Sequence, residues 1–121
     1  MPVLFISIND GGTNMNLKKL GIVAFVTFWA TLNSSAYVAT GNPTASGLYP
    51  REGITCAANY INGIYVPFGT VIVLPDGSKL YVEDRMHPDY GHDAVDIFMN
   101  SKSKAIQWGR RSIRCQVIVP D

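Results

Sequence analysis

The sequence predicts a small, mainly β domain, a compact barrel of short strands with one short helix. Runs rich in β-branched and aromatic residues recur from residue 37 to the end and are separated by Gly, Pro and Asn clusters. One such cluster, Pro75-Asp76-Gly77-Ser78, has good hairpin chemistry, because Pro fixes φ and Gly permits a positive φ. A single helix is indicated at 102–108, where Ser101 offers an N-cap and Gly109 a stop.

The strands follow in order along the chain. Asn62-Gly63 marks a turn within a loop at 59–67. At 113–119, apolar residues at every second position predict a closing strand with Cys115 facing inward. At 94–99, the same two-residue period places Asp96 on the face of the strand opposite Val95. The β-type runs are 37–40, 54–58, 70–74, 79–82, 94–99 and 113–119.

The N-terminal part resembles a secretory signal in its pattern. Lys18 and Lys19 form a short positive segment, residues 20–32 carry no charge, and small residues precede Ala36. We therefore expect a signal helix in an N-terminal segment 1–36, cleavage after Ala36, an exported protein acting in the periplasm or cell wall, and a single domain at 37–121. The apolar run is shorter than the roughly 20 residues of a membrane span, although an uncleaved anchor is the alternative.

Charge and cysteine content narrow the class of protein. Within 37–121 acidic and basic residues balance, whereas nucleic-acid-binding domains usually show a basic excess. We therefore expect that the protein has no nucleic-acid partner, and we expect it to be a monomer.

The two cysteines of segment 37–121 are an isolated pair. In an oxidising compartment, Cys56 and Cys115 predict a disulfide, the alternative being two small buried residues that never meet.

Titratable side chains concentrate between residues 82 and 98. Asp84 and Asp96 each stand where a β-type run meets a loop, and the loop between them holds both histidines of the chain, His87 and His92. Asp89 and Asp93 lie in the same loop, but without a helix to fix the ligand spacing we predict no metal site. If the protein performs chemistry, we expect it here.

Five segments in order resemble the 3D (three-aspartate) domain of the double-psi β-barrel superfamily. They are Thr44-Ala45-Ser46-Gly47, Val66-Pro67-Phe68-Gly69-Thr70, Val82-Glu83-Asp84, Val95-Asp96-Ile97-Phe98 and Ala105-Ile106-Gln107-Trp108-Gly109-Arg110-Arg111. The resemblance covers nearly all of 37–119 and implies a six-stranded double-psi β-barrel. There are two departures: Asn62 occupies the position of the first family aspartate, and the usual Gly-rich loop after the second is replaced by the segment 85–91.

The resemblance implies a lytic transglycosylase that cleaves the glycan strands of peptidoglycan without using water and needs no cofactor. Asp96 would be the acid/base and Asp84 the partner that raises its pKa, although the roles could be exchanged. Thr44 and Ser46, from the matching loop, and Asn62 would contact the substrate. Independently of the resemblance, we expect His87 and His92, from the loop between the two aspartates, to act as sugar contacts or a secondary acid.

Other interpretations stay open at this point. Asp84 could cap a turn, and Asp96 could bond backbone N–H groups, Arg85 or Arg111. The departures from the family pattern favour a non-catalytic glycan-binding barrel module, and a lysis-associated or inhibitor protein could use the same scaffold.

Overall fold

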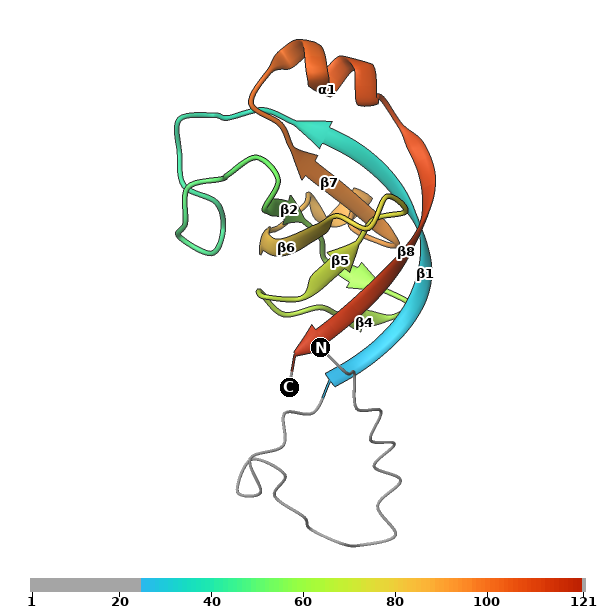
Figure 1. Cartoon of the computed structure of the whole chain (residues 1–121). Helices are drawn as coiled ribbons and strands as arrows, with labels where there is room; N and C mark the ends of the chain where they lie inside the picture. The colour runs from blue at the N-terminus through green and yellow to red at the C-terminus, as the bar shows by residue number, and fades with distance from the viewer. Residues whose placement is uncertain (1–24, 121) are drawn as a thin grey trace, which may run out of the picture.

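The structure, a computed structural model, describes residues 25–120. It contains a closed barrel of six strands, a two-stranded hairpin and one α-helix (Figure 1). The predicted fold class, a mainly β six-stranded barrel with one short helix, is confirmed. Among residues 25–120 no helix has the length and apolar character needed to cross a membrane.

The strands of the barrel occur in the order β1-β7-β2-β6-β5-β8 around the sheet. Their bounds are β1 Phe25–Tyr37, β2 Thr55–Ala57, β5 Val71–Val73, β6 Lys79–Asp84, β7 Ala94–Phe98 and β8 Arg111–Pro120. The remaining elements are β3 Tyr60–Ile61, β4 Ile64–Tyr65, the 3-10 turn η2 Pro88–Tyr90 and α1 Lys102–Trp108. The order places β1 and β6 on either side of the β7–β2 pair, which is where the candidate site lies.

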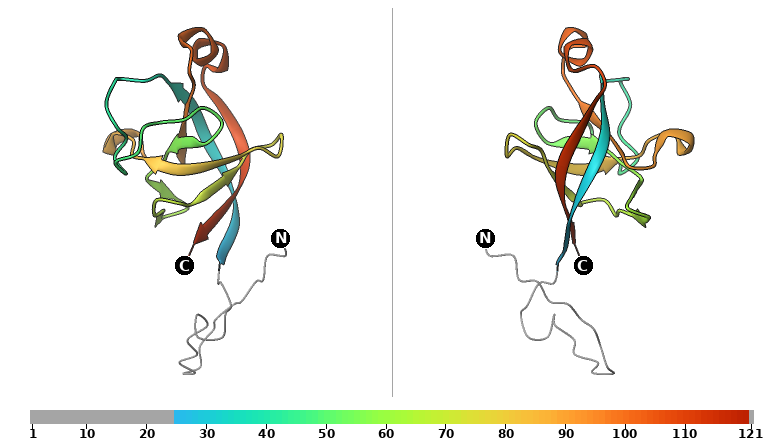
Figure 2. Two further views of the ribbon diagram at one scale, coloured as in Figure 1. Left: turned by 60° about the vertical axis from the view of Figure 1, so that its left-hand side comes forward. Right: turned by 90° about the vertical axis from the view of Figure 1, so that its right-hand side faces the viewer.

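Two long strands dominate the architecture. β1 and β8 run antiparallel along one side of the barrel, from the pair Phe25 and Pro120 to the pair Ser34 and Arg111 (Figures 1 and 2). β1 also pairs in parallel with β7, so the same strand has a neighbour on each edge. Helix α1 lies beyond the upper ends of β7 and β8 in Figure 1 and begins at the predicted N-cap, Ser101.

Alternating side chains fill the barrel. On β8 Ile113, Cys115 and Val117 are buried, as the sequence pattern predicted, and Leu32 of β1 is fully buried among them. The predicted hairpin also forms: Ile72 pairs with Leu80 across the turn. A second hairpin, β3 and β4, was predicted only as a loop, although its Asn62-Gly63 turn was correctly expected.

The expected domain boundary at Tyr37 differs from the structure. Residues 25–36 form most of β1 and are neither helical nor separate from the barrel, because Ala30, Leu32 and Ser34 point into the core. The barrel therefore includes residues 25–36, and cleavage after Ala36 would remove most of one of its six strands. The part of the predicted signal before residue 25 lies outside the described residues.

The expected disulfide is not present in the structure. Cys56 and Cys115 are both free thiols, fully buried in the barrel. Burial raises the pKa of the Cys115 thiol to about 11 and that of the Cys56 thiol still further. Both residues serve here as small apolar side chains of the core, the alternative stated above.

Candidate functional site

The two predicted carboxylates flank one small residue on the outer face of the barrel. Ala57 of β2 pairs with Asp96 of β7 on one side and with Asp84 of β6 on the other. Residues directly opposite each other on neighbouring strands point to the same face. The two carboxylates therefore share a face, on either side of Ala57.

An irregularity in β6 aims Asp84 at this face. Cys56 pairs with Val82, whereas the next residue, Ala57, pairs with Asp84, so Glu83 is an extra residue in the ladder. With regular alternation Asp84 would point the same way as the buried Val82, into the core. The bulge turns it outward, as bulges beside functional sites often do.

Asp96 is a half-buried carboxyl group. Its Oδ1 accepts a hydrogen bond from Ser35 Oγ at 3.0 Å, and Ser35 lies directly opposite it on β1. Burial raises the pKa of Asp96; the Ser35 hydrogen bond opposes this rise, the charge of Asp84 adds to it, and Arg110 opposes it. The direction of this shift is the one that a carboxyl group acting as a general acid needs.

Both carboxylate oxygens of Asp84 accept hydrogen bonds from other groups of the protein. Oδ1 accepts hydrogen bonds from the backbone N–H groups of Ala45 (2.9 Å) and Arg85 (2.8 Å), and Oδ2 accepts one from the Tyr37 hydroxyl (3.2 Å). Burial, followed by the charge of Asp84, raises the pKa of Tyr37 far above its ordinary value. Tyr37 therefore stays protonated and donates to Asp84, which lies on the same face as Asp96.

Asp96 opens onto a cleft of about 740 Å³, a volume typical of small-ligand sites. Asp84 does not line this cleft, so only one of the two carboxylates borders it. The side chains around the cleft are mainly basic, aromatic and hydroxyl groups: Ser35, Arg85, His87, Tyr90, His92, Arg110 and Arg111.

Both histidines, which were predicted to contact the substrate, lie on the cleft wall. His87 caps η2, where its Nδ1 accepts a hydrogen bond from the Asp89 N–H at 3.1 Å. The His92 ring stacks on Tyr60, with 5.1 Å between ring centroids and 8° between planes. Among residues 25–120, no three His, Cys, Asp or Glu side chains gather as a potential metal site.

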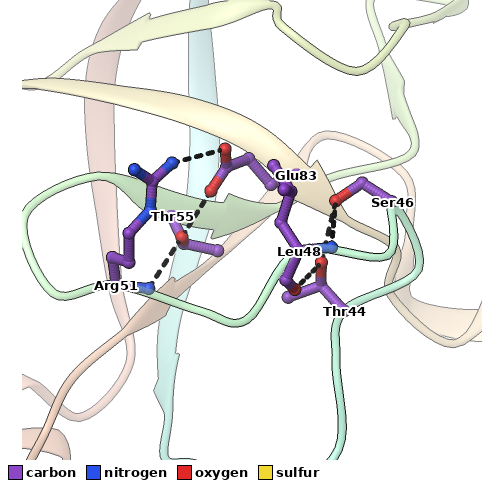
Figure 3. A network of polar contacts seen from close by, with 6 residues as sticks. All are labelled: Thr44, Ser46, Leu48, Arg51, Thr55 and Glu83. Atoms are coloured by element: carbon purple, nitrogen blue, oxygen red, sulfur yellow. Dashed lines mark hydrogen bonds and ion pairs between the residues drawn. The ribbon is translucent and has the colours of Figure 1, made fainter.

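Thr44 and Ser46 do not line the cleft, so direct sugar contact is not supported for them. Their hydroxyls bond each other at 2.8 Å, and Thr44 Oγ1 also donates to the Leu48 carbonyl at 2.7 Å (Figure 3). These bonds shape the loop that presents the Ala45 N–H to Asp84. Their observed contribution to the site is indirect.

The other end of this loop is fixed by the bulge residue. Glu83 is 8% exposed; it accepts a hydrogen bond from Thr55 Oγ1 at 2.6 Å and pairs with the Arg51 guanidinium at 3.0 Å (Figure 3). The bulge thus fulfils two tasks at once. It turns Asp84 to the site face and gives the loop an anchor on β6.

Asn62 lies apart from the carboxylates, at the tip of the β3–β4 hairpin. Its φ of 50° is a turn conformation that Asn tolerates. Its backbone N–H donates to Asp93 Oδ1 at 2.8 Å, and its side-chain amide donates to the Trp29 carbonyl at 3.3 Å. The structure assigns Asn62 a role in the turn and does not bring it to the cleft.

Three residues of the site were not predicted from the sequence. Ser35 was assigned to a cleaved leader, and Tyr37 was treated only as the start of a strand. Arg110 was noted as part of the helix end but not as a neighbour of Asp96. The signal for Ser35 and Tyr37 was available in the alternation of β1, where polar residues at 31, 33 and 35 interleave with the buried ones at 30, 32 and 34.

The wall of the cleft depends on a glycine. A Cβ at Gly91 would collide with the Asn59 side-chain amide, which bonds both the N–H and the C=O of Met86 at 2.9 Å. We expect Gly91→Ala to destabilise the protein by about 1–3 kcal/mol, because the Asn59 side chain leaves no space for an added methyl group at residue 91. Urea denaturation measures this change in the free energy of unfolding. In the double variant with Asn59→Ala the two amide contacts are removed and only the contact with the Cβ of residue 59, at 2.9 Å, remains. The combined cost should therefore be smaller than the sum of the two single costs; additive costs would contradict this explanation.

Comparison with models of known protein families and with curated proteins found no match to this chain. The chemistry of the site therefore rests on its geometry. It consists of one half-buried carboxyl group whose pKa is raised by burial, a second carboxyl group on the same face, and an open cleft lined by basic side chains and Tyr90. Such an arrangement can donate a proton to a ligand in the cleft and then take one back.

Proposed function

We propose that the protein is a peptidoglycan lytic transglycosylase in which Asp96 acts as both acid and base. The observation that carries the proposal is the half-buried Asp96 carboxyl group, raised in pKa and open to a cleft. The motif resemblance to the 3D domain and the closed six-stranded barrel agree with it. The protein would act on the glycan strands of the cell wall after export.

The proposed reaction uses the sugar's own hydroxyl group in place of water. Protonated Asp96 donates its proton to the glycosidic oxygen while the bond from that oxygen to C1 of the muramic acid breaks. The resulting carboxylate takes the proton from the C6 hydroxyl of the same sugar as that oxygen bonds to C1. A 1,6-anhydro ring forms, and Asp96 is protonated again, so no net proton is consumed.

Asp84 and Tyr37 would act through Asp96. The negative charge of Asp84 disfavours ionisation of Asp96, and its three hydrogen-bond donors hold that charge in place. Ser35 and Arg110 oppose this effect, so the pKa of Asp96 is set by a balance. In this proposal Asp96, which lines the cleft, faces the substrate, and Asp84 is its electrostatic partner.

The pH profile should reveal this balance. Activity requires protonated Asp96 and should fall as pH rises through its pKa. Asp84→Asn removes a charge that raises this pKa, so the alkaline limb of kcat/KM should move to lower pH. Arg110→Gln removes a charge that lowers it, so the limb should move to higher pH. Shifts in the same direction for both variants would contradict the proposed electrostatics.

A non-catalytic glycan-binding module is the second candidate. It is favoured by the cleft wall itself, where the Tyr90 side chain is 69% exposed beside three arginines, an arrangement suited to holding a ligand. This function would not need the raised pKa of Asp96. The two candidates therefore differ in whether bonds are broken.

One experiment separates them. The full chain and an Asp96→Asn variant are incubated with intact peptidoglycan sacculi, and both soluble fragments and sacculus-bound protein are measured. The proposal predicts released fragments from the parent and none from the variant, with both proteins binding. Binding by both without fragments would establish the module, and neither binding nor fragments would refute both candidates.

A further inference from the structure

A cluster of exposed aromatic rings lies beside the cleft, and the proposed mechanism does not use it. We name it the aromatic shelf: Tyr60, Tyr65 and Phe68, with Arg85 between the last two. The Tyr60 and Tyr65 rings are 5.0 Å apart, and the Arg85 guanidinium lies 4.3 Å from the centroids of both Tyr65 and Phe68. The three aromatic residues are 40%, 53% and 41% exposed.

The shelf is continuous with the cleft. Arg85 belongs to the shelf and also lines the cleft, and His92 of the cleft wall stacks on Tyr60. The wall that surrounds Asp96 and the exposed rings are therefore joined by direct contacts. A chain-like ligand leaving the cleft on this side would pass directly onto the shelf.

The shelf is held rigidly. Arg85 donates from the same nitrogen to the carbonyl oxygens of Ala58 (2.9 Å) and Val66 (2.7 Å), so its guanidinium plane is fixed between the rings. The Tyr60 N–H donates to the Gly91 carbonyl at 2.9 Å, and the Tyr60 carbonyl accepts from the Asp93 N–H at 2.8 Å. The hairpin and the cleft wall thus form one unit, which reduces the ordering cost of binding.

We propose that the aromatic shelf is an extension subsite that holds sugars of the glycan strand beyond the pair at the scissile bond. This inference rests on the function proposed above. A pyranose ring has a face of C–H groups that packs on the electron-rich face of an aromatic ring. Its hydroxyls need hydrogen-bonding partners beside the rings. Arg85 lies over the Tyr65 and Phe68 rings and has five N–H donors, while both of its hydrogen bonds come from one nitrogen. The imidazole of His92, stacked on Tyr60, adds a second polar group. A purely apolar partner would offer no acceptor to the N–H groups of the other guanidinium nitrogens.

The test measures how affinity depends on chain length. β-1,4-linked N-acetylglucosamine disaccharide and hexasaccharide are titrated into the full chain carrying Asp96→Asn, which prevents turnover. Tyr65→Ala and Phe68→Ala are then added singly, and Tyr49→Ala, which removes a 65% exposed tyrosine from the loop before β2, is the matched control.

We expect tighter binding of the hexasaccharide than of the disaccharide. Each shelf variant should weaken hexasaccharide binding by about tenfold and leave disaccharide binding unchanged, and Tyr49→Ala should change neither. Unaltered length dependence in the shelf variants would overturn the subsite and leave the transglycosylase proposal standing. The same holds if no saccharide binds, because glycan cleavage is judged separately by fragment release from sacculi.

Discussion

Replacing Asp96 by Asn is expected to reduce glycan cleavage by about 10²–10⁴-fold, the usual contribution of a general acid–base group. The amide has nearly the same shape, and its oxygen can still accept the hydrogen bond from Ser35 Oγ. It cannot donate a proton to the glycosidic oxygen and recover it. Steady-state fragment release from sacculi measures the loss, with Asp89→Asn, another cleft residue, as the control that should retain activity.

The same substitution should stabilise the fold at neutral pH. The pKa of Asp96 is raised in the folded protein, so its ionisation at neutral pH opposes folding. This cost is absent below the unfolded pKa of about 3.9 and develops as pH rises through the folded pKa. The amide of the Asp96→Asn variant does not ionise, so its Tm should exceed the parent's at pH 7, with the difference vanishing near pH 3. A lower Tm at pH 7 would indicate a purely structural role for Asp96.

Removing residues before Tyr37 should prevent folding, the second large effect. The deletion takes away most of β1, which pairs with both β7 and β8 and places Leu32 in the core. Burial of one such side chain contributes about 1.5–3 kcal/mol, and the opened barrel would expose two unpaired edges. A domain's net stability is only about 5–15 kcal/mol, so the combined loss should exceed it.

The measurement compares two purified chains, one beginning at Phe25 and one at Tyr37. Circular dichroism and amide proton dispersion in NMR spectra should show a folded protein for the first and an unfolded chain for the second. A cooperative unfolding transition in the shorter chain would mean that β1 is dispensable. It would also restore the domain boundary that the sequence suggested.

Much of the fold could be predicted because its signals are local. The Pro75–Ser78 turn, the Ser101 cap and the alternation around Cys115 each depend on neighbouring residues alone. β1 was misread because an uncharged apolar run after two lysines is the pattern of a signal as well as of a buried strand. Its alternation of polar residues at 31, 33 and 35 favours the strand, since a signal core does not alternate.

The site could be predicted only in part. Asp84 and Asp96 could be predicted because a carboxylate is unusual in a β-type run. In the structure both pair with Ala57 and lie on the same face of the sheet. The bulge at Glu83 that makes this possible cannot be read from the sequence, because it depends on pairing with β2. Likewise, the hydroxyls of Thr44 and Ser46 were expected to contact a ligand. In the structure they form hydrogen bonds within their own loop.

The most direct test of the central claim is the origin of the oxygen at the newly formed sugar end. Sacculi are digested by the full chain in water enriched in ¹⁸O, and the released fragments are analysed by mass spectrometry. If the C6 hydroxyl of the sugar closes the ring while Asp96 carries the proton, the fragments end in anhydro sugars without ¹⁸O. Fragments that carry one ¹⁸O at C1 would show attack by water, and the transglycosylase mechanism would be wrong.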